Sequence, residues 1–380
     1  MPPSQFPSRR QTLKTLAGLT ATGVAASALP AFAAPLPPLK ELAAAKGLLF
    51  GSAVGAGKAG TLTGSFENTH YRDLLKRECN VLVAENEHKI YVIAAQPDRY
   101  NFEPADKLTN FARDNGMKMR GHTLFWNRVD FLPQWVLNYD FGPFPATECE
   151  RFLRDYIETV CDHYKDRIYS WDVVNETIDP QTGLVRETPF TKAMGFDALR
   201  VAYEAAREYA PGTELVYNDY MGWEKGNETH RHGVLKLLEK FKKENVPIDA
   251  FGIQSHLGND GRIDNIQHRE WKAFIDEIVG MGYNLLITEL DVNDKDLPSD
   301  IKTRDAQQAS VTKDYLDFML SYPQLKSVLC WGLVDSYNWL QDFAPRADGK
   351  PQRPTPYDAD FRPKPIREAI ASALKAAPAR

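Results

Sequence analysis

The feature that most constrains the fold of this chain is a regular alternation of strand-like and helix-like segments after residue 47. Eight short apolar runs lie at 48–54, 80–84, 117–124, 168–174, 214–217, 250–254, 284–290 and 328–333. Helix-like segments follow them near 67–78, 104–115, 147–165, 193–210, 230–245, 268–282, 304–321 and 365–375. Strands that alternate with helices of this length form parallel βαβ units, and eight such units close a barrel. We therefore predict an α/β fold, a single (β/α)₈ TIM barrel.

A doubly wound open sheet is the main structural alternative, and it would need a phosphate-binding loop after the first strand. The glycine-rich stretch 51–60 resembles such a loop only superficially. Gly57-Lys58 is followed by Ala59 instead of Ser or Thr, and Ser52 occupies the position where the first glycine is required. The glycine spacing also differs from the dinucleotide-binding fingerprint. We interpret this stretch as an ordinary loop between a strand and a helix.

The first 33 residues have the composition of an export signal. Arg9 and Arg10 precede Lys14 and an apolar, alanine-rich run at 16–29, and Ala31 and Ala33 form a small-residue cleavage pattern. The paired arginines match a twin-arginine signal. A membrane-spanning helix is the alternative, but the run is shorter than the roughly 20 residues that a bilayer requires. We predict a cleaved export signal at 1–33, a lead-in at 34–46 and a catalytic domain at 47–378, in an exported protein, periplasmic or secreted.

Charge and cysteine content exclude several classes of function. The formal net charge is −5, and residues 1–33 hold three basic residues and no acid, so the mature chain carries −8. An acidic chain lacks the electrostatic footprint of a nucleic-acid-binding protein. Cys79, Cys149, Cys161 and Cys330 have no metal-ligand spacing. We expect a monomer with no nucleic-acid or membrane partner, no metal, no cofactor and no structural disulfide.

Polar residues gather where the predicted strands end. These runs are 85–89, 121–127, 171–176, 217–220, 254–256, 288–291 and 331–335. In a barrel, the carboxyl ends of the strands meet at one mouth, where active sites lie. One carboxylate at a strand end is more often a helix cap or an ion-pair partner. Seven polar strand ends at one mouth carry a desolvation cost, and a functional site is the explanation we favour.

The residue types at these ends indicate sugar chemistry. Carboxylates and amides dominate, and no serine or cysteine nucleophile motif is present. Glycoside cleavage uses a pair of carboxyl groups, and Glu176 and Glu289 end the fourth and seventh strands. Burial at the end of an apolar strand would favour a protonated Glu176, as a general acid requires. His256, oriented by Asp291, would donate to Glu289 and favour its ionised form.

The motifs WDVVNE at 171–176, GIQSHL at 252–257 and TELD at 288–291 occur in this order. From residue 50 to residue 370, the chain resembles the retaining family-ten endo-1,4-β-xylanases. The resemblance implies that Glu176 is the acid/base and Glu289 the nucleophile in the hydrolysis of internal bonds of xylan or xylo-oligosaccharides. It also implies supporting roles: Asn175 binds the sugar 2-hydroxyl, Gln254 and His256 flank the nucleophile, and Asp291 holds His256.

The same resemblance assigns substrate-binding residues. Those that line the next sugar on the non-reducing side would be Glu85, Asn86 and Lys89. Those that wall the cleavage subsite would be His122, Trp126, Trp331 and Trp339.

The chain departs from the family pattern at three positions and in one loop. His88 and Ile90 replace Met and Trp, and we expect them to alter packing more than chemistry. Asn127 replaces a histidine beside the cleavage subsite, so we expect an effect on pH optimum or rate. The long loop at 342–360 carries Arg346 and Arg353 and would reshape the aglycone side.

Two alternatives stay open at this stage. A cellulase or mannanase of the same barrel group would also place Asn-Glu on the fourth strand. The bulky indole of Trp339 favours xylan, because it leaves little room for a hexose hydroxymethyl group. A carbohydrate-binding barrel without catalytic activity would be expected to lack one of the two glutamates, and this chain has both.

Overall fold

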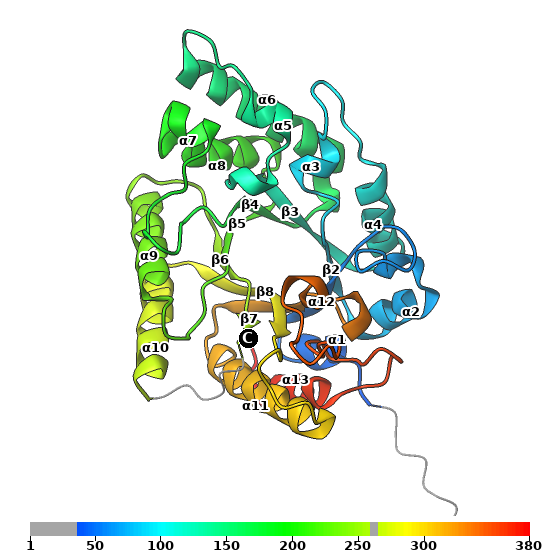
Figure 1. Ribbon diagram of the computed structural model, residues 1–380. Helices are drawn as coiled ribbons and strands as arrows, with labels where there is room; N and C mark the ends of the chain where they lie inside the picture. The colour runs from blue at the N-terminus through cyan, green and yellow to red at the C-terminus, as the bar shows by residue number, and fades with distance from the viewer. Residues whose placement is uncertain (1–35, 259–264) are drawn as a thin grey trace, which may run out of the picture. The chain divides into compact units, whose positions relative to one another are not determined.

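The computed structural model describes residues 36–258 and 265–380, so the predicted export signal lies outside the described residues. One compact unit runs from Pro37 to Arg380, with strands at its centre and helices outside them (Figure 1). The main strands are β1 (Leu49–Val54), β2 (Val81–Ala84), β3 (Lys118–Trp126), β4 (Ser170–Asn175), β5 (Glu214–Asp219), β6 (Ala250–Ile253), β8 (Asn284–Val292) and β9 (Leu325–Cys330).

These eight strands form a closed, parallel barrel. Each pairs with its neighbour in chain order, β6 pairs directly with β8, and β9 pairs back onto β1. Closure leaves no unpaired edge among them. A ninth, two-residue strand, β7 (His256–Leu257), follows β6 and pairs with the far end of β8, which sets His256 opposite Asp291. The predicted (β/α)₈ barrel is confirmed.

Eight long helices surround the barrel in the described part of the chain, as the periodicity predicts. They are α2 (Thr69–Glu78), α4 (Glu103–Asp114), α6 (Pro145–Tyr164), α8 (Asp197–Tyr209), α9 (Glu228–Lys243), α10 (Asn265–Gly280), α11 (Ile301–Met319) and α13 (Pro365–Ala376). Among residues 36–258 and 265–380, five short α-helices lie in the loops or before β1: α1 (Leu39–Ala44), α3 (Ile90–Ile93), α5 (Gln134–Leu137), α7 (Pro189–Met194) and α12 (Leu340–Phe343).

The last predicted strand is displaced by three residues. The last strand begins at Leu325 and ends at Cys330, whereas the sequence predicted 328–333. Gly332 has a φ of +91°, a conformation that ends regular strand pairing. Trp331 and Leu333 therefore belong to the loop at the barrel mouth, although both are buried and apolar like strand residues.

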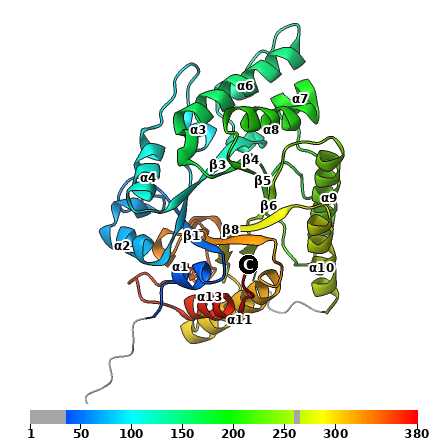
Figure 2. The same cartoon turned by 180° about the vertical axis from the view of Figure 1, so that it is seen from behind.

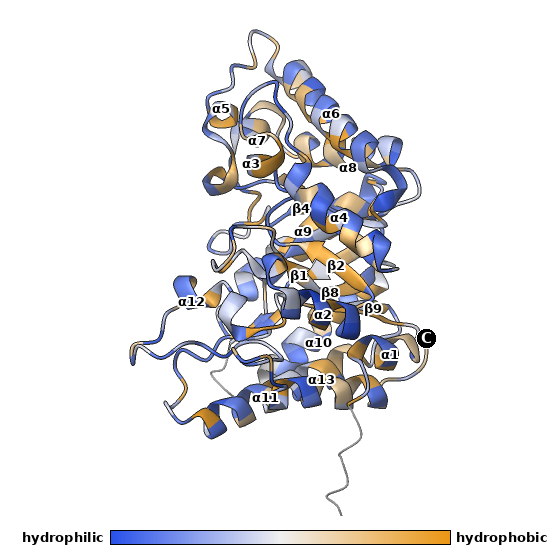
Figure 3. Cartoon of the chain, turned by 90° about the vertical axis from the view of Figure 1, so that its right-hand side faces the viewer, coloured by the Kyte–Doolittle hydropathy of each residue, from blue (hydrophilic) through white to orange (hydrophobic). Residues whose placement is uncertain are grey.

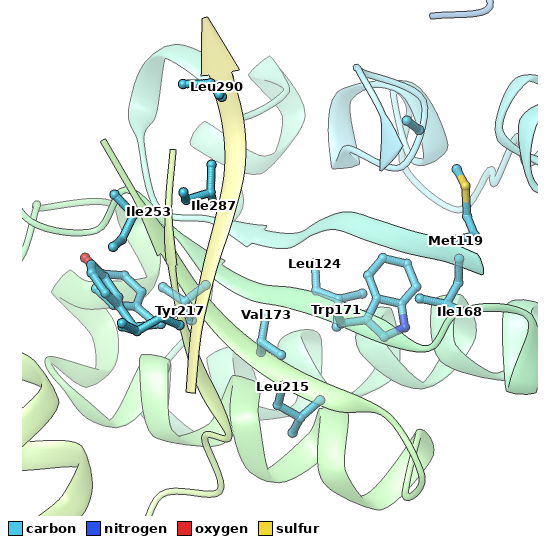
Figure 4. Close-up of a cluster of buried hydrophobic side chains, with 14 of the residues drawn as sticks. Met119, Leu124, Ile168, Trp171, Val173, Leu215, Tyr217, Ile253, Ile287 and Leu290 are labelled. Carbon is cyan, nitrogen blue, oxygen red and sulfur yellow. The ribbon is translucent and has the colours of Figure 1, made fainter. Parts of the chain in front are cut away.

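The core lies between the strands and the surrounding helices. Figure 3 shows the apolar strands at the centre and helices with both hydrophilic and hydrophobic residues. Figure 4 shows one part of this layer, in which Trp171 and Leu215 lie on neighbouring strands. A side chain at Gly121 on β3 would place its Cβ 2.0 Å from the Trp171 ring. The full burial of Trp171 therefore depends on a glycine at that position.

Part of the predicted lead-in belongs to the barrel domain. Helix α1 lies beside β1 and α13 in the view from behind (Figure 2). Its Leu39 and Ala43 are fully buried in the main core. All four cysteines are buried as free thiols. No helix within residues 36–258 and 265–380 has the length and apolar character needed to cross a membrane.

Candidate active site

Glu289 lies near the end of β8 and is almost completely buried. Its Oε1 accepts a hydrogen bond from the side-chain amide of Asn218 (2.8 Å), and its Oε2 lies 3.2 Å from Nε2 of His256. Nδ1 of His256 lies 2.9 Å from a carboxylate oxygen of Asp291. The indole of Trp339 donates to the other oxygen of Asp291 (2.8 Å). These contacts are the ones that the sequence predicted: Asp291 contacts His256, and His256 contacts Glu289.

These contacts decide the charge of the pair. Burial alone would raise the pKa of Glu289, but the hydrogen bond from His256 and the nearby charge of Lys89 lower it to about 2. Burial opposes the charge of His256 as well, yet Asp291 and Glu289 raise the pKa of the imidazole to about 10. Glu289 is therefore a carboxylate beside an imidazolium across the neutral pH range.

Glu176 follows the last residue of β4 and has a positive φ of +51°. A left-handed conformation in a residue with a side chain costs about 1–3 kcal/mol and persists where the surroundings enforce it, often at functional sites. Three donors converge on its carboxylate: Nε2 of Gln254 on Oε1 (2.9 Å), and Nε1 of Trp126 (3.2 Å) and Nη1 of Arg128 (2.7 Å) on Oε2.

Amide side chains connect the two glutamates. Nδ2 of Asn218, which bonds Glu289, lies 2.9 Å from the amide of Asn175, the residue before Glu176. The backbone N–H of Glu289 donates to the carbonyl of Gln254 (2.9 Å), whose side chain bonds Glu176. Glu176 and Glu289 therefore share one hydrogen-bonded network at the barrel mouth.

The loop after β2 brings Glu85, Asn86 and Lys89 to the same mouth. Nζ of Lys89 lies 3.3 Å from Oδ1 of Asn86 and 4.6 Å from the ring centre of Trp126. Burial, together with the neighbouring charge of Glu87, raises the pKa of Glu85 to about 8. A Cβ at Gly55, in the loop after β1, would lie 2.8 Å from a carboxylate oxygen of Glu85. The glycine-rich stretch thus makes room for this acid.

Aromatic rings line the mouth beside these groups. His122 lies 5.5 Å from Trp331 between ring centres, and its Nδ1 is 2.8 Å from Asp172. His256 lies 5.0 Å from the ring of Trp339. The substrate-binding and supporting residues that the sequence predicted therefore lie in loops or strand ends at this mouth, except His122, which lies within β3.

The structure adds detail to other expectations. Gln254 lies beside Glu289, because its carbonyl accepts from the backbone of that residue, but its side chain bonds Glu176. Asn127 does not reach the carboxylates, because its amide bonds Thr177 and Thr188 (2.8 and 2.7 Å) in the next loop. Arg353 binds Asp305 with two 2.8 Å hydrogen bonds, so it anchors its loop to α11.

Arg346 also anchors its loop. It bonds the carbonyl of Leu297 (2.8 Å) and the side chain of Asp348, in the long loops after β8 and β9. His88 behaves as expected. It is fully buried, and its ring lies 4.9 Å from Tyr164 and 5.5 Å from Trp171 in the core. Burial lowers the pKa of His88 to about 3, so it packs as a neutral ring.

Two residues whose side chains bond the carboxylates of these glutamates are not among those that the sequence predicts. Asn218 lies in the polar run at 217–220, but no feature of the sequence links it to Glu289. Arg128 sits two residues beyond β3, and only its contact with Glu176 reveals its place in the site. Within the described part of the chain, no cluster of three or more His, Cys, Asp and Glu side chains could hold a metal ion.

A parallel barrel that presents two buried glutamates, amide donors and aromatic rings at its mouth defines a glycoside hydrolase. The model of glycosyl hydrolase family 10 matches residues 38–373, and the chain belongs to this family.

Similar proteins agree with this assignment. Over 309 residues the chain is 34% identical to endo-1,4-β-xylanase A of Caldicellulosiruptor saccharolyticus, covering 77% of this chain and 86% of that protein. The structure of native xylanase 10B from Thermotoga maritima superposes with a TM-score of 0.78 at 30% identity, over 89% of this chain and 98% of that one. Xylanase 10B from Thermotoga petrophila in complex with xylobiose gives 0.79 at 29% identity, over 90% and 98%.

Proposed function

We propose that this enzyme hydrolyses internal β-1,4-xylosidic bonds of xylan by double displacement, with Glu289 as nucleophile and Glu176 as acid/base. The observation that carries the proposal is that two buried glutamates, one after β4 and one on β8, share one hydrogen-bonded network at the barrel mouth but have different charged partners. Glu289 is held ionised by an imidazolium and an amide. Glu176 sits in a turn that directs it into the mouth, where its partners are neutral donors and one arginine on the edge of a cavity.

In the first step, Glu289 attacks the anomeric carbon while Glu176 gives its proton to the glycosidic oxygen, and the bond to the leaving sugar breaks. In the second step, the Glu176 carboxylate takes a proton from water. The water oxygen bonds to the anomeric carbon, and the ester bond to Glu289 breaks. Two displacements retain the configuration at the anomeric carbon. Lys89, Asn86 and Glu85 would bind the next sugar on the non-reducing side.

Xylan is the favoured substrate because of the wall around His256. Trp339 is fixed by its bond to Asp291 and lies against the imidazole, so the indole cannot easily move aside. A hexose would bring an extra hydroxymethyl group toward this wall. Release of reducing sugar from xylan, compared with cellulose and mannan, tests the choice. Faster release from cellulose or mannan would favour the other glycanases of this barrel group.

Azide rescue of two matched variants tests the assigned roles. Glu289→Ala should lose more than about a thousandfold of kcat, and azide should restore turnover as the α-glycosyl azide by attack from the vacated face. Glu176→Ala should give the β-glycosyl azide, because azide then attacks the intermediate on Glu289 from the opposite face. Proton NMR of the products distinguishes the anomers. The assignment would be contradicted if Glu289→Ala gave the β-azide and Glu176→Ala the α-azide, or if either variant kept full activity.

A further inference from the structure

We infer that Arg128 is a positioning residue that binds the ionised form of Glu176 between the two steps and withdraws when the leaving sugar binds. The inference rests on the acid/base role proposed for Glu176. It assigns to Arg128 a part in one step, the attack of water, and no part in substrate specificity.

The contacts of Arg128 hold its guanidinium against one carboxylate oxygen. Nη1 lies 2.7 Å from Oε2 of Glu176, and Nη2 lies 3.3 Å from Asp130. The guanidinium also lies 5.0 Å from the ring centre of Phe131, which stacks on Trp126 with 3.6 Å between ring centres. Its Nε is buried without a hydrogen-bond partner. One strong, charged contact therefore fixes a side chain whose other polar atoms are poorly held.

This arrangement suits Glu176 as a base and not as an acid. With Gln254 on Oε1, and Trp126 and Arg128 on Oε2, all the protein partners of this carboxylate are donors. Oε2 already accepts two N–H donors, from Trp126 and Arg128, so it cannot also carry the proton for the glycosidic oxygen while both stay in place. If Oε2 is the oxygen that donates, the guanidinium must move before proton donation. It can return after the leaving sugar departs, when Glu176 is ionised.

A cavity beside Arg128 provides room for the leaving sugar to bind and for the guanidinium to move. It has a volume of about 340 Å³ and is lined by the loops that follow β3 and β4, including Arg128, Val129, Asp179 and Leu184. Val129 and Leu184 are apolar yet 46% and 67% exposed, as expected for side chains that contact the face of a sugar ring. The acids that line the cavity each have a cationic partner, which suits a neutral sugar: Asp179 pairs with Arg186 (3.2 Å), Asp130 with Arg128 (3.3 Å) and Glu187 with Lys192 (2.8 Å).

The test compares Arg128→Met with Arg128→Lys on substrates that differ in their leaving group. With a 2,4-dinitrophenyl β-xylobioside the leaving group needs no proton, and kcat reports the attack of water on the intermediate. We expect Arg128→Met to lower this kcat about tenfold, the size expected for a charged hydrogen bond. Its KM should fall in parallel, leaving kcat/KM unchanged. Arg128→Lys should recover most of kcat.

Two further measurements separate positioning from a general structural role. Azide needs no base, so it should restore kcat of Arg128→Met on the dinitrophenyl substrate. On xylotetraose, where cleavage needs the acid, kcat/KM of Arg128→Met should equal or exceed that of the unchanged enzyme. Arg113→Met, which removes an exposed arginine paired with Asp114, serves as the matched control. Its kcat and kcat/KM should equal those of the unchanged enzyme on both substrates.

Equal losses of kcat/KM on both substrates, or a tenfold loss that azide does not restore, would overturn the inference. So would an Arg128→Met enzyme that is unchanged on both substrates. The failure of the proposed function is distinguishable from these results. It would appear as Glu176→Ala giving no β-glycosyl azide, whatever the behaviour of Arg128→Met.

Discussion

At the scale of single residues, the site contains two glutamates whose side chains are chemically identical but have different hydrogen-bond partners. Glu289 and Glu176 are both buried at the barrel mouth. Glu289 faces a cationic imidazole that Asp291 supports, and Glu176 faces two neutral donors and the guanidinium of Arg128. The two carboxyl groups therefore lie in different environments, and the different roles proposed for them rest on this difference.

Removal of His256 should change the acidic side of the pH profile. His256 is the main reason that the pKa of Glu289 is about 2, since burial by itself raises it. In His256→Ala, the acidic limb of kcat/KM on a xylo-oligosaccharide should therefore move to higher pH. Asp291→Asn should move it in the same direction but less, because the imidazole remains. An acidic limb that stays in place in both variants would contradict this account.

The same pair links stability to pH. The pKa of His256 rises from 6.5 to about 10 on folding, so its contribution is complete below pH 6.5 and is lost as pH rises through about 10. The pKa of Glu289 falls from 4.5 to about 2, so its contribution is present above pH 4.5 and is lost as pH falls through about 2. The difference in Tm between the unchanged enzyme and His256→Ala should be greatest between pH 4.5 and 6.5. A constant difference from pH 3 to 10 would contradict the linkage.

At the scale of elements, buried charges join helices that are distant in sequence. Glu78 ends α2 and is fully buried, and it accepts hydrogen bonds from the backbone of Leu39 (2.8 Å) and from the hydroxyl of Tyr357 (2.8 Å). Arg367 on α13, also buried, lies 3.2 Å from the same carboxylate. One glutamate thus connects α1, α2 and α13.

Replacement of Glu78 by alanine should destabilise the barrel strongly. The change leaves the guanidinium of Arg367 buried without its main partner, a situation that costs about 3–5 kcal/mol. Urea unfolding followed by tryptophan fluorescence measures the loss. Asp73→Asn on the same helix removes an exposed ion pair with Lys76 and should leave the midpoint unchanged. Equal midpoints for Glu78→Ala and Asp73→Asn would show that the buried network contributes little.

At the scale of the whole molecule, the barrel accounts for residues from Pro37 onward, and the basic N-terminal segment has a separate predicted role in export. If the twin-arginine route operates, conversion of both Arg9 and Arg10 to lysine should leave folded precursor in the cytoplasm. The mature N-terminus of the exported enzyme should lie close to Ala34. Cell fractionation and N-terminal sequencing measure both outcomes. Normal export of the double variant would contradict the twin-arginine route but leave secretion by another route open.

The sequence by itself determined the barrel, its eight strand and helix pairs, the two glutamates and the Asp291–His256–Glu289 relay. Each of these follows from the hydrophobic period or from a position at a strand end. The carboxyl ends of the strands of a parallel barrel meet at one mouth, and this does not depend on the conformation of the loops. His256 and Asp291 are predictable partners for the same reason, since neighbouring strand ends place them opposite one another.

Only the tertiary structure decided the partners of Glu176 and the direction of the loop side chains. Arg128 and Gln254 meet Glu176 across 48 and 78 residues of sequence. Asn127 turns away from the site although Arg128, the next residue, turns toward it. Beyond a strand end no period governs side-chain direction. It depends on the backbone conformation of each loop residue and on the groups packed around it, and neither is encoded in local sequence pattern.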